Sequence, residues 1–164
     1  QSGSHRFAPK DATDDEVMAA CCRWANDHIK FFNPDVVAIE APIMSTSMGG
    51  GQSNAHTIFM LWSLSSIVRT VVKLRRPSPA HLTNVQSARK FFVGQSRFEA
   101  GKAKPAVMAR CVQLGWVPDD EKSTDRCDAL CVWAYEAALV DKDFAANLTP
   151  LGTANVIPIN REVA

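Results

Sequence analysis

The sequence lacks any apolar run that approaches the roughly 20 residues needed to cross a membrane. Residues 1–5 are polar, without the apolar stretch of a signal peptide. An excess of one charge is also missing, because the formal net charge is +1. Total charge therefore makes no argument for nucleic acid, and nothing in these features indicates a membrane partner.

Cysteine is present without a disulfide framework. There are five cysteines, an odd number with no regular spacing, so we expect reduced thiols in an intracellular protein. Cys127 and Cys131 lie four residues apart with no second Cys or His pair nearby. This isolation favours helix packing over a zinc site.

What remains is the composition of one globular domain. The 164 residues are 46% hydrophobic and 21% charged, enough to bury a core. The pattern predicts a single α/β domain over residues 1–164, with an irregular C-terminal tail over 141–164. Helices are expected over 13–32, 54–74, 104–114 and 124–139, a buried strand over 36–42, and a short strand over 81–85.

The strand expected at 36–42 ends on Glu40 and Pro42. Its run of apolar residues indicates burial on both faces. A carboxylate at the end of such a strand is costly to keep charged unless a cation compensates it. We interpret Glu40 as a ligand of a divalent metal, shared with Asp125 and Asp128.

Asp125 and Asp128 are three residues apart at the start of an apolar helix. This spacing places both carboxylates on one face. Helix capping is the alternative explanation, because acidic residues in a first turn are favoured by the exposed amides and the helix dipole.

The segment 89–110 contains six basic residues and one acid, Glu99, with three phenylalanines interleaved. Such a segment suits a phosphate backbone, although a solvated surface loop is the alternative. Acids that hold Mg²⁺ or Mn²⁺, opposite lysines that engage phosphates, form the usual arrangement for phosphodiester hydrolysis. The basic residues are Arg89, Lys90, Arg97, Lys102, Lys104 and Arg110.

A series of motifs follows along residues 15–140. They are NPDVVAIE at 33–40, an apolar helix with Asn54 near its start, RKFFVG at 89–94, Lys104 ahead of Val107, and DRCDAL at 125–130. In this order the motifs resemble the RuvC family of Holliday-junction resolvases, most closely its phage-type members, in the RNase H-like superfamily.

The resemblance implies an RNase H-like fold, with a mixed central sheet flanked by helices. It implies that Glu40, Asp125 and Asp128 are catalytic carboxylates that bind Mg²⁺ or Mn²⁺, two ions per site. It also implies that Lys104, together with Arg89 or Lys90, lies by the scissile phosphate. The corresponding location is the cytoplasm of a bacterium or of a phage-infected host cell.

The family acts as a homodimer on the two symmetric strands of a four-way junction. The resemblance assigns dimerisation to the helix 54–74, although a buried core helix explains its apolar surface equally well. Ile43 and Met44 stand where the family often has an aromatic residue that stacks on a base. An apolar wedge could act there instead, and a broader choice of branched DNA is credible. The expected DNA-binding residues are Arg89, Lys90, Arg97, Lys102, Lys104, Ile43 and Met44.

The family also has a catalytic aspartate on a first strand, and no acid ahead of Glu40 fits that role. We therefore expect roughly 20–35 further residues, the length of a strand hairpin, to precede Gln1. A polypeptide without them is expected to be inactive.

These observations lead to one expected function and two rivals. The first is a metal-dependent, structure-selective DNA endonuclease with Glu40, Asp125, Asp128 and Lys104 as catalytic residues. The second is a non-catalytic RNase H-like module that binds branched DNA or a protein. The third is a nuclease of the same superfamily that acts on RNA–DNA hybrids or linear DNA. An acidic strand-end residue encoded upstream would favour an enzyme over the module.

Overall fold

The computed structural model describes residues 2–42, 47–48, 51–52, 55–78 and 80–148. Its contacts divide the chain into two compact units. The N-terminal unit comprises residues 5–82, and the C-terminal unit comprises residues 1–4 together with 83–164.

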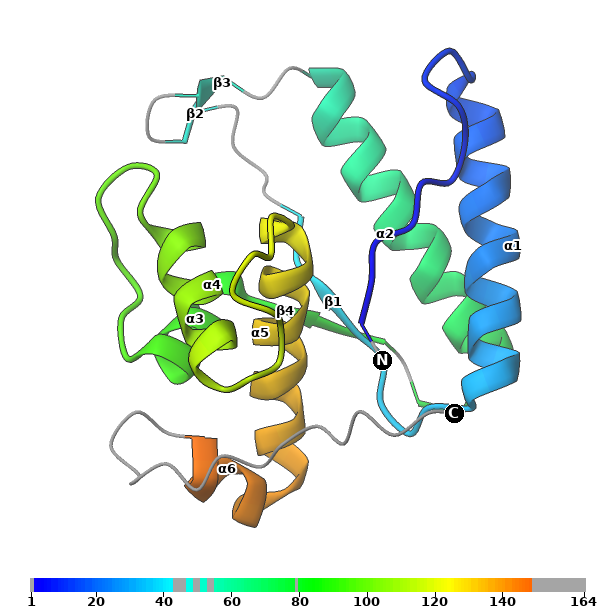
Figure 1. The fold of residues 1–164 in the computed structure, drawn as a ribbon. Helices are drawn as coiled ribbons and strands as arrows, with labels where there is room; N and C mark the ends of the chain where they lie inside the picture. Colours follow the sequence, from blue (N-terminus) through cyan, green and yellow to red (C-terminus); the bar gives the residue numbers. More distant parts are fainter. Residues whose placement is uncertain (1, 43–46, 49–50, 53–54, 79, 149–164) are drawn as a thin grey trace. The chain divides into compact units, whose positions relative to one another are not determined.

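The helix α1 (Asp14–Phe32) opens the N-terminal unit and has the ends that the sequence predicts (Figure 1). Thr13 is its N-cap and forms a capping box with Glu16, whose carboxylate accepts from the Thr13 backbone N–H at 2.8 Å. At the other end Asn33 adopts the left-handed conformation, with φ of 42°. Both ends are therefore set by local side-chain chemistry.

The rest of the N-terminal unit contains four strands and one helix: β1 (Ala38–Glu40), the hairpin strands β2 (Ser47–Met48) and β3 (Gly51–Gln52), α2 (Ala55–Arg75) and β4 (His81–Thr83). The last residue of β4, Thr83, already belongs to the C-terminal unit. β1 pairs with β4, and the backbone N–H of His81 donates to the Val37 carbonyl at 2.8 Å. The core between α1 and α2 contains Ala25, Ile29, Val71, Val72 and Ala80.

The expected α/β fold with a mixed RNase H-like sheet is wrong. The described residues are mostly helical, and β1 and β4 form a two-stranded parallel sheet. The run at Val36 is apolar, but Val36 is 37% exposed and Glu40 is exposed. A strand becomes buried on both faces only inside a wider sheet. Most other apolar residues recur at helical spacing and build helices instead.

α2 also corrects the expectation that no segment of the chain is apolar and long enough to cross a membrane. It is long and apolar enough, by length and composition, to cross a membrane, the one such helix in the described part of the chain. Core helices of soluble proteins meet the same criterion, so α2 assigns no location. Phe59 and Leu61 on α2 are 53% and 47% exposed. The dimer contact expected for this helix stays a prediction.

The C-terminal unit is helical in its described part: α3 (Val85–Val93), α4 (Ala103–Gln113), α5 (Thr124–Val140) and α6 (Lys142–Leu148). Phe92 is fully buried and stacks on Trp116, with ring centroids 5.5 Å apart. α6 lies within the stretch expected to be irregular. It forms because the Asp141 side chain accepts hydrogen bonds from the backbone N–H groups of Asp143 and Phe144, both at 3.0 Å.

Thiols fill part of this core. All five cysteines are free, and Cys111, Cys127 and Cys131 are almost completely buried. The Cys111 thiol donates to the Cys127 carbonyl at 3.9 Å. Burial, followed by the neighbouring Cys127, raises the pKa of Cys111 far above its usual range. These thiols therefore behave as small apolar core residues.

Candidate functional site: an acidic and basic cluster at the start of α5

The candidate site begins at the N-terminal end of α5, where the preceding loop is tied down by its own side chains. Ser123 is the N-cap, and its hydroxyl accepts from the backbone N–H of Arg126 at 3.2 Å. One oxygen of Glu121 accepts from the Ser123 backbone N–H at 2.8 Å, and the other pairs with the Arg126 guanidinium at 2.6 Å. These contacts fix the turn that carries Asp125 and Asp128.

The same contacts lower the pKa of the Glu121 carboxyl. The largest cause is the hydrogen bond from the Ser123 backbone N–H, and the hydrogen bond from Arg126 adds to it. Hydrogen bonds to a charged carboxylate favour that charged form. Glu121 therefore stays ionised at pH values at which a free glutamate would already be protonated.

Asp125 and Asp128 differ sharply in their exposure to solvent. The Asp125 side chain is 85% exposed, whereas that of Asp128 is 8% exposed. A buried carboxylate requires a compensating charge or hydrogen bonds. The surroundings of Asp128 supply both.

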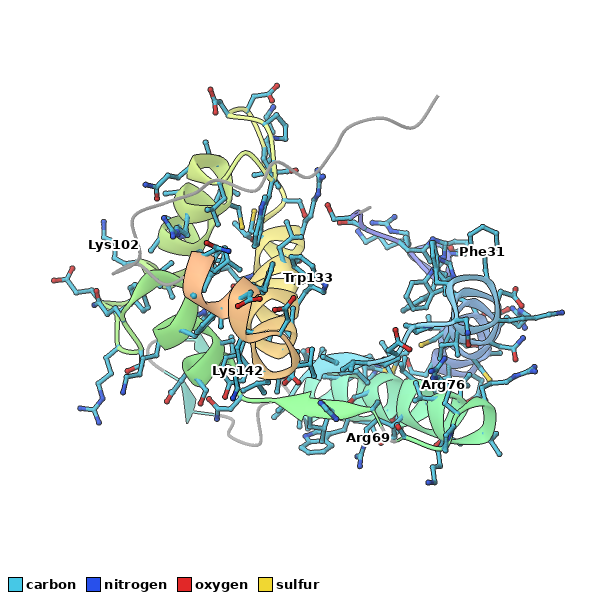
Figure 2. The ribbon with its side chains drawn as sticks, turned by 90° about the horizontal axis from the view of Figure 1, so that it is seen from below. Phe31, Arg69, Arg76, Lys102, Trp133 and Lys142 are labelled. Carbon is cyan, nitrogen blue, oxygen red and sulfur yellow. The ribbon has the colours of Figure 1, made fainter. Side chains whose placement is uncertain are left out.

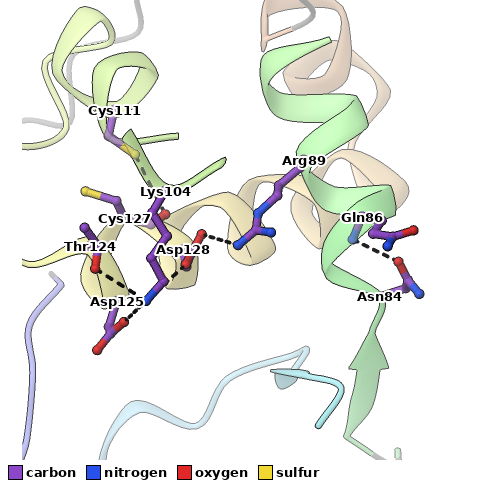
Figure 3. Close-up of polar contacts among 9 residues, drawn as sticks. All are labelled: Asn84, Gln86, Arg89, Lys104, Cys111, Thr124, Asp125, Cys127 and Asp128. Carbon is purple, nitrogen blue, oxygen red and sulfur yellow. Dashed lines mark hydrogen bonds and ion pairs between the residues drawn. The ribbon is translucent and has the colours of Figure 1, made fainter. Parts of the chain in front are cut away.

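Lys104 connects the two carboxylates (Figure 3). It lies in the first turn of α4, next to Pro105, a residue favoured at helix starts. Its Nζ lies 2.7 Å from Asp125 Oδ1 and 4.0 Å from Asp128 Oδ2. It also donates to the Thr124 hydroxyl at 3.5 Å. The predicted grouping of Lys104 with both aspartates is therefore present within the C-terminal unit.

Arg89 approaches Asp128 from α3, a helix whose N-cap Asn84 accepts from two backbone N–H groups. Arg89 Nη2 donates to Asp128 Oδ1 at 3.2 Å, and its side chain is 17% exposed. Its Nε is buried and has no hydrogen-bond partner among the described residues. Lys90, in contrast, is exposed. Of these two basic residues, Arg89 is the one in the cluster.

The remaining expected DNA-binding residues of the C-terminal unit form no part of the cluster. Lys90, Arg97 and Lys102 have exposed side chains, and Figure 2 labels Lys102. The backbone carbonyl of Arg97 accepts a hydrogen bond from the Gln95 side-chain amide. Among the described residues, Lys90, Arg97 and Lys102 take part in none of the ion pairs found. Exposed cations of this kind could contact a polyanion.

The other expected site residues lie in or near the N-terminal unit. Glu40 is the last residue of β1 and is exposed, so the burial that motivated a metal at this position is not found. It belongs to a different unit from Asp125 and Asp128. Ile43 and Met44 lie outside the described residues.

The sequence interpretation missed several residues that shape the site. Thr124 contributes a hydroxyl to Lys104, and Glu121 holds the loop ahead of the helix. Deeper in the unit, the Thr83 hydroxyl donates to the buried Glu136 carboxylate at 2.6 Å. Only Thr124 had a usable signal, since it directly precedes Asp125. The Thr83 contact spans 53 residues and leaves no local pattern.

The carboxylates of the cluster bear on the metal that the resemblance implies. The described residues contain no group of three or more His, Cys, Asp or Glu side chains able to hold a metal ion. The pair Asp125 and Asp128 nevertheless supplies carboxylate oxygens, and Mg²⁺ is commonly held by one or two carboxylates together with waters and substrate phosphates. The pair therefore fits a hard cation that a phosphate helps to hold.

The sequence matches no protein-family model and no curated protein. The resemblance to the RuvC family therefore depends on the sequence motifs alone and stays a prediction.

Proposed function

We propose that the protein is a metal-dependent endonuclease that hydrolyses phosphodiester bonds in branched DNA, including four-way junctions. The observation that carries the proposal is the position of Lys104 against both Asp125 and Asp128, with Arg89 on the far side of Asp128. Cations and carboxylates that alternate in this way suit a phosphate and its counter-ion.

Each residue has a distinct task in this proposal. Asp125 and Asp128 would hold Mg²⁺ or Mn²⁺, which when bound activates water and stabilises the leaving oxygen. Lys104 places a positive charge where negative charge develops in the transition state. Arg89 orients Asp128 through its hydrogen bond, and Lys90, Arg97 and Lys102 contact the DNA backbone. Glu40 belongs to the other unit, and its role as a third carboxylate stays a prediction from the sequence.

The test uses the full protein, with any residues encoded ahead of Gln1 included. A labelled four-way junction, a flap and an RNA–DNA hybrid are incubated side by side with Mg²⁺ or Mn²⁺. Asp125→Asn is expected to abolish cleavage and preserve junction binding. Its side chain is 85% exposed, so the fold should not change. Asp119→Asn, an exposed acid of the same unit outside the cluster, is the matched control and should cut normally.

Undiminished cleavage by both Asp125→Asn and Asp128→Asn would refute the assignment. Cleavage of the RNA–DNA hybrid alone would instead assign the protein as a nuclease for that substrate.

A second candidate, a non-catalytic module that binds branched DNA, is favoured by one observation. Arg89 and Lys104 already neutralise the two aspartates, as they would in a purely structural ion-pair network. Junction binding with no cleavage of any substrate by the wild-type protein would select this candidate.

A further inference from the structure

A series of aromatic rings runs along α1 towards its C-terminal end. Trp24, His28 and Phe32 are spaced four residues apart, which places them on one side of the helix. The ring centroids of Trp24 and His28 are 4.2 Å apart, and those of His28 and Phe32 are 5.8 Å apart. Phe31 meets Phe32 edge to face at 4.8 Å. The rings therefore form a continuous aromatic series.

The two ends of this series differ. At its start, Trp24 is covered by His5, which stacks on it, and by Phe7, which meets it edge on. At its far end, Phe31 is 81% exposed and Phe32 is 56% exposed. Most isolated apolar residues on a surface need no explanation, but two adjacent exposed rings that continue a stack are a specific feature. They present aromatic faces and edges to solvent.

Basic residues outnumber acids on the C-terminal parts of α1 and α2. The C-terminal parts of α1 and α2 pack together, since Arg75 donates to the Asn26 side chain at 3.0 Å and Arg76 donates to that of Asn33 at 2.6 Å. The segments 23–35 and 69–76 contain six basic residues and two acids. The basic residues are Arg23, Lys30, Arg69, Lys73, Arg75 and Arg76, and the acids are Asp27 and Asp35.

The end of α1 is also rigidly held. Asn33 stops the helix in the left-handed conformation, its backbone N–H donates to the Ile29 carbonyl, and its side chain accepts from Arg76. His28 is fixed by a 2.9 Å hydrogen bond between Nδ1 and the Trp24 carbonyl, in which Nδ1 is the donor. Rings that are already positioned lose little conformational entropy when a ligand stacks on them.

We propose that this end of the N-terminal unit binds single-stranded nucleic acid, with bases that stack on Phe31 and Phe32 and phosphates that meet the exposed Lys30 and Arg75. Arg76 instead supports the end of α1, because its side chain is 19% exposed and lies 3.9 Å from Asp35. Aromatic rings beside cations match a ligand with flat π faces and one negative charge per residue. Figure 2 labels Phe31 on α1 and Arg76 just beyond α2, both within this unit. The proposal does not depend on cleavage, because it uses no residue of the α5 cluster.

The test measures the affinity of the full chain for a fluorescein-labelled fifteen-nucleotide oligodeoxythymidine by anisotropy. EDTA is present, so that cleavage plays no part. Phe31→Ala with Phe32→Ala is expected to weaken binding at least about tenfold, since each stacked base contributes a large share of the affinity. Phe31→Tyr with Phe32→Tyr should bind like the wild type. Phe59→Ala, which removes a 53% exposed ring elsewhere in the same unit, is the matched control and should change affinity less than twofold.

Several results would overturn the proposal. One is unchanged binding by the double alanine variant at an unchanged melting temperature, and another is an equal loss in Phe59→Ala. A third concerns vesicles of phosphatidylserine and phosphatidylcholine. If the double alanine variant loses vesicle binding but keeps oligonucleotide binding, the surface binds a membrane and not nucleic acid. Asp125→Asn should bind the oligonucleotide like the wild type, which separates this proposal from the proposed cleavage.

Discussion

Replacing Arg89 by methionine removes the cation that lies closest to the buried carboxylate of Asp128. At 3.2 Å, and with an effective dielectric constant of about 20, the attraction between the two charges is about 5 kcal/mol before desolvation is subtracted. Loss of one partner from a buried pair typically costs about 3–5 kcal/mol, because the other charge is left uncompensated. Lys104 remains at 4.0 Å but is half exposed and screened. We therefore expect a loss of about 3 kcal/mol.

The companion variants separate this charge effect from simple truncation. Asp128→Leu alone leaves Arg89 without its partner and should also destabilise. The double variant replaces the pair by apolar side chains and should recover at least half of the summed loss, since buried ion pairs are often replaceable in this way. Arg97→Met, an exposed basic residue of the same unit, is the control and should stay within about 0.5 kcal/mol of the wild type.

Urea unfolding gives these free energies. Trp24→Phe and Trp62→Phe form the background, so that tryptophan fluorescence reports Trp116 and Trp133 in the C-terminal unit. Additive losses in the double variant, with a coupling free energy below about 0.5 kcal/mol, would show that Arg89 does not compensate Asp128. The cluster described at the start of α5 would then be an incidental proximity.

Two further predictions concern groups whose pKa is shifted. The lowered pKa of Glu121 contributes stability that is present above the ordinary glutamate pKa and is lost as the pH falls through the folded value. Urea midpoints measured from pH 6 to pH 2 should therefore fall less in Glu121→Gln, and identical profiles would contradict this. In the native protein, Ellman's reagent should label the exposed thiol of Cys22 first, and the buried thiol of Cys111 should react only on unfolding. Rapid labelling of a native Cys22→Ser variant would contradict this.

Local chemistry was readable from the sequence. The helix expected over 13–32 agrees with α1, because its caps, Thr13 with Glu16 at the start and Asn33 at the end, depend on residues within one turn. The helix α3 over 85–93 was not among the expected helices, although Asn84 and Gly94 carry the signals of its two ends. The same holds for α6, whose side-chain cap at Asp141 was overlooked.

The sheet was not readable from the sequence, because strand pairing depends on partners far along the chain. Val36 and its neighbours have the composition of a central strand, yet three residues of this stretch form β1 and pair with β4. The candidate site shows the same division. The spacing of Asp125 and Asp128 predicted that both carboxylates lie on one face, whereas the pairing of Arg89 with Asp128 spans 39 residues and required the packing of α3 against α5.

The unequal exposure of Asp125 and Asp128 has a consequence for how fast each carboxylate can change partners. The ammonium of Lys104 that meets Asp125 is carried by a half-exposed side chain, and exposed side chains change rotamer within picoseconds to nanoseconds. Arg89 and Asp128 are both largely buried, so we expect a change of partner to require local opening between α3 and α5, a motion of microseconds or longer. An arriving cation would therefore meet Asp125 at the rate of diffusion, and Asp128 would respond at the slower rate of helix opening.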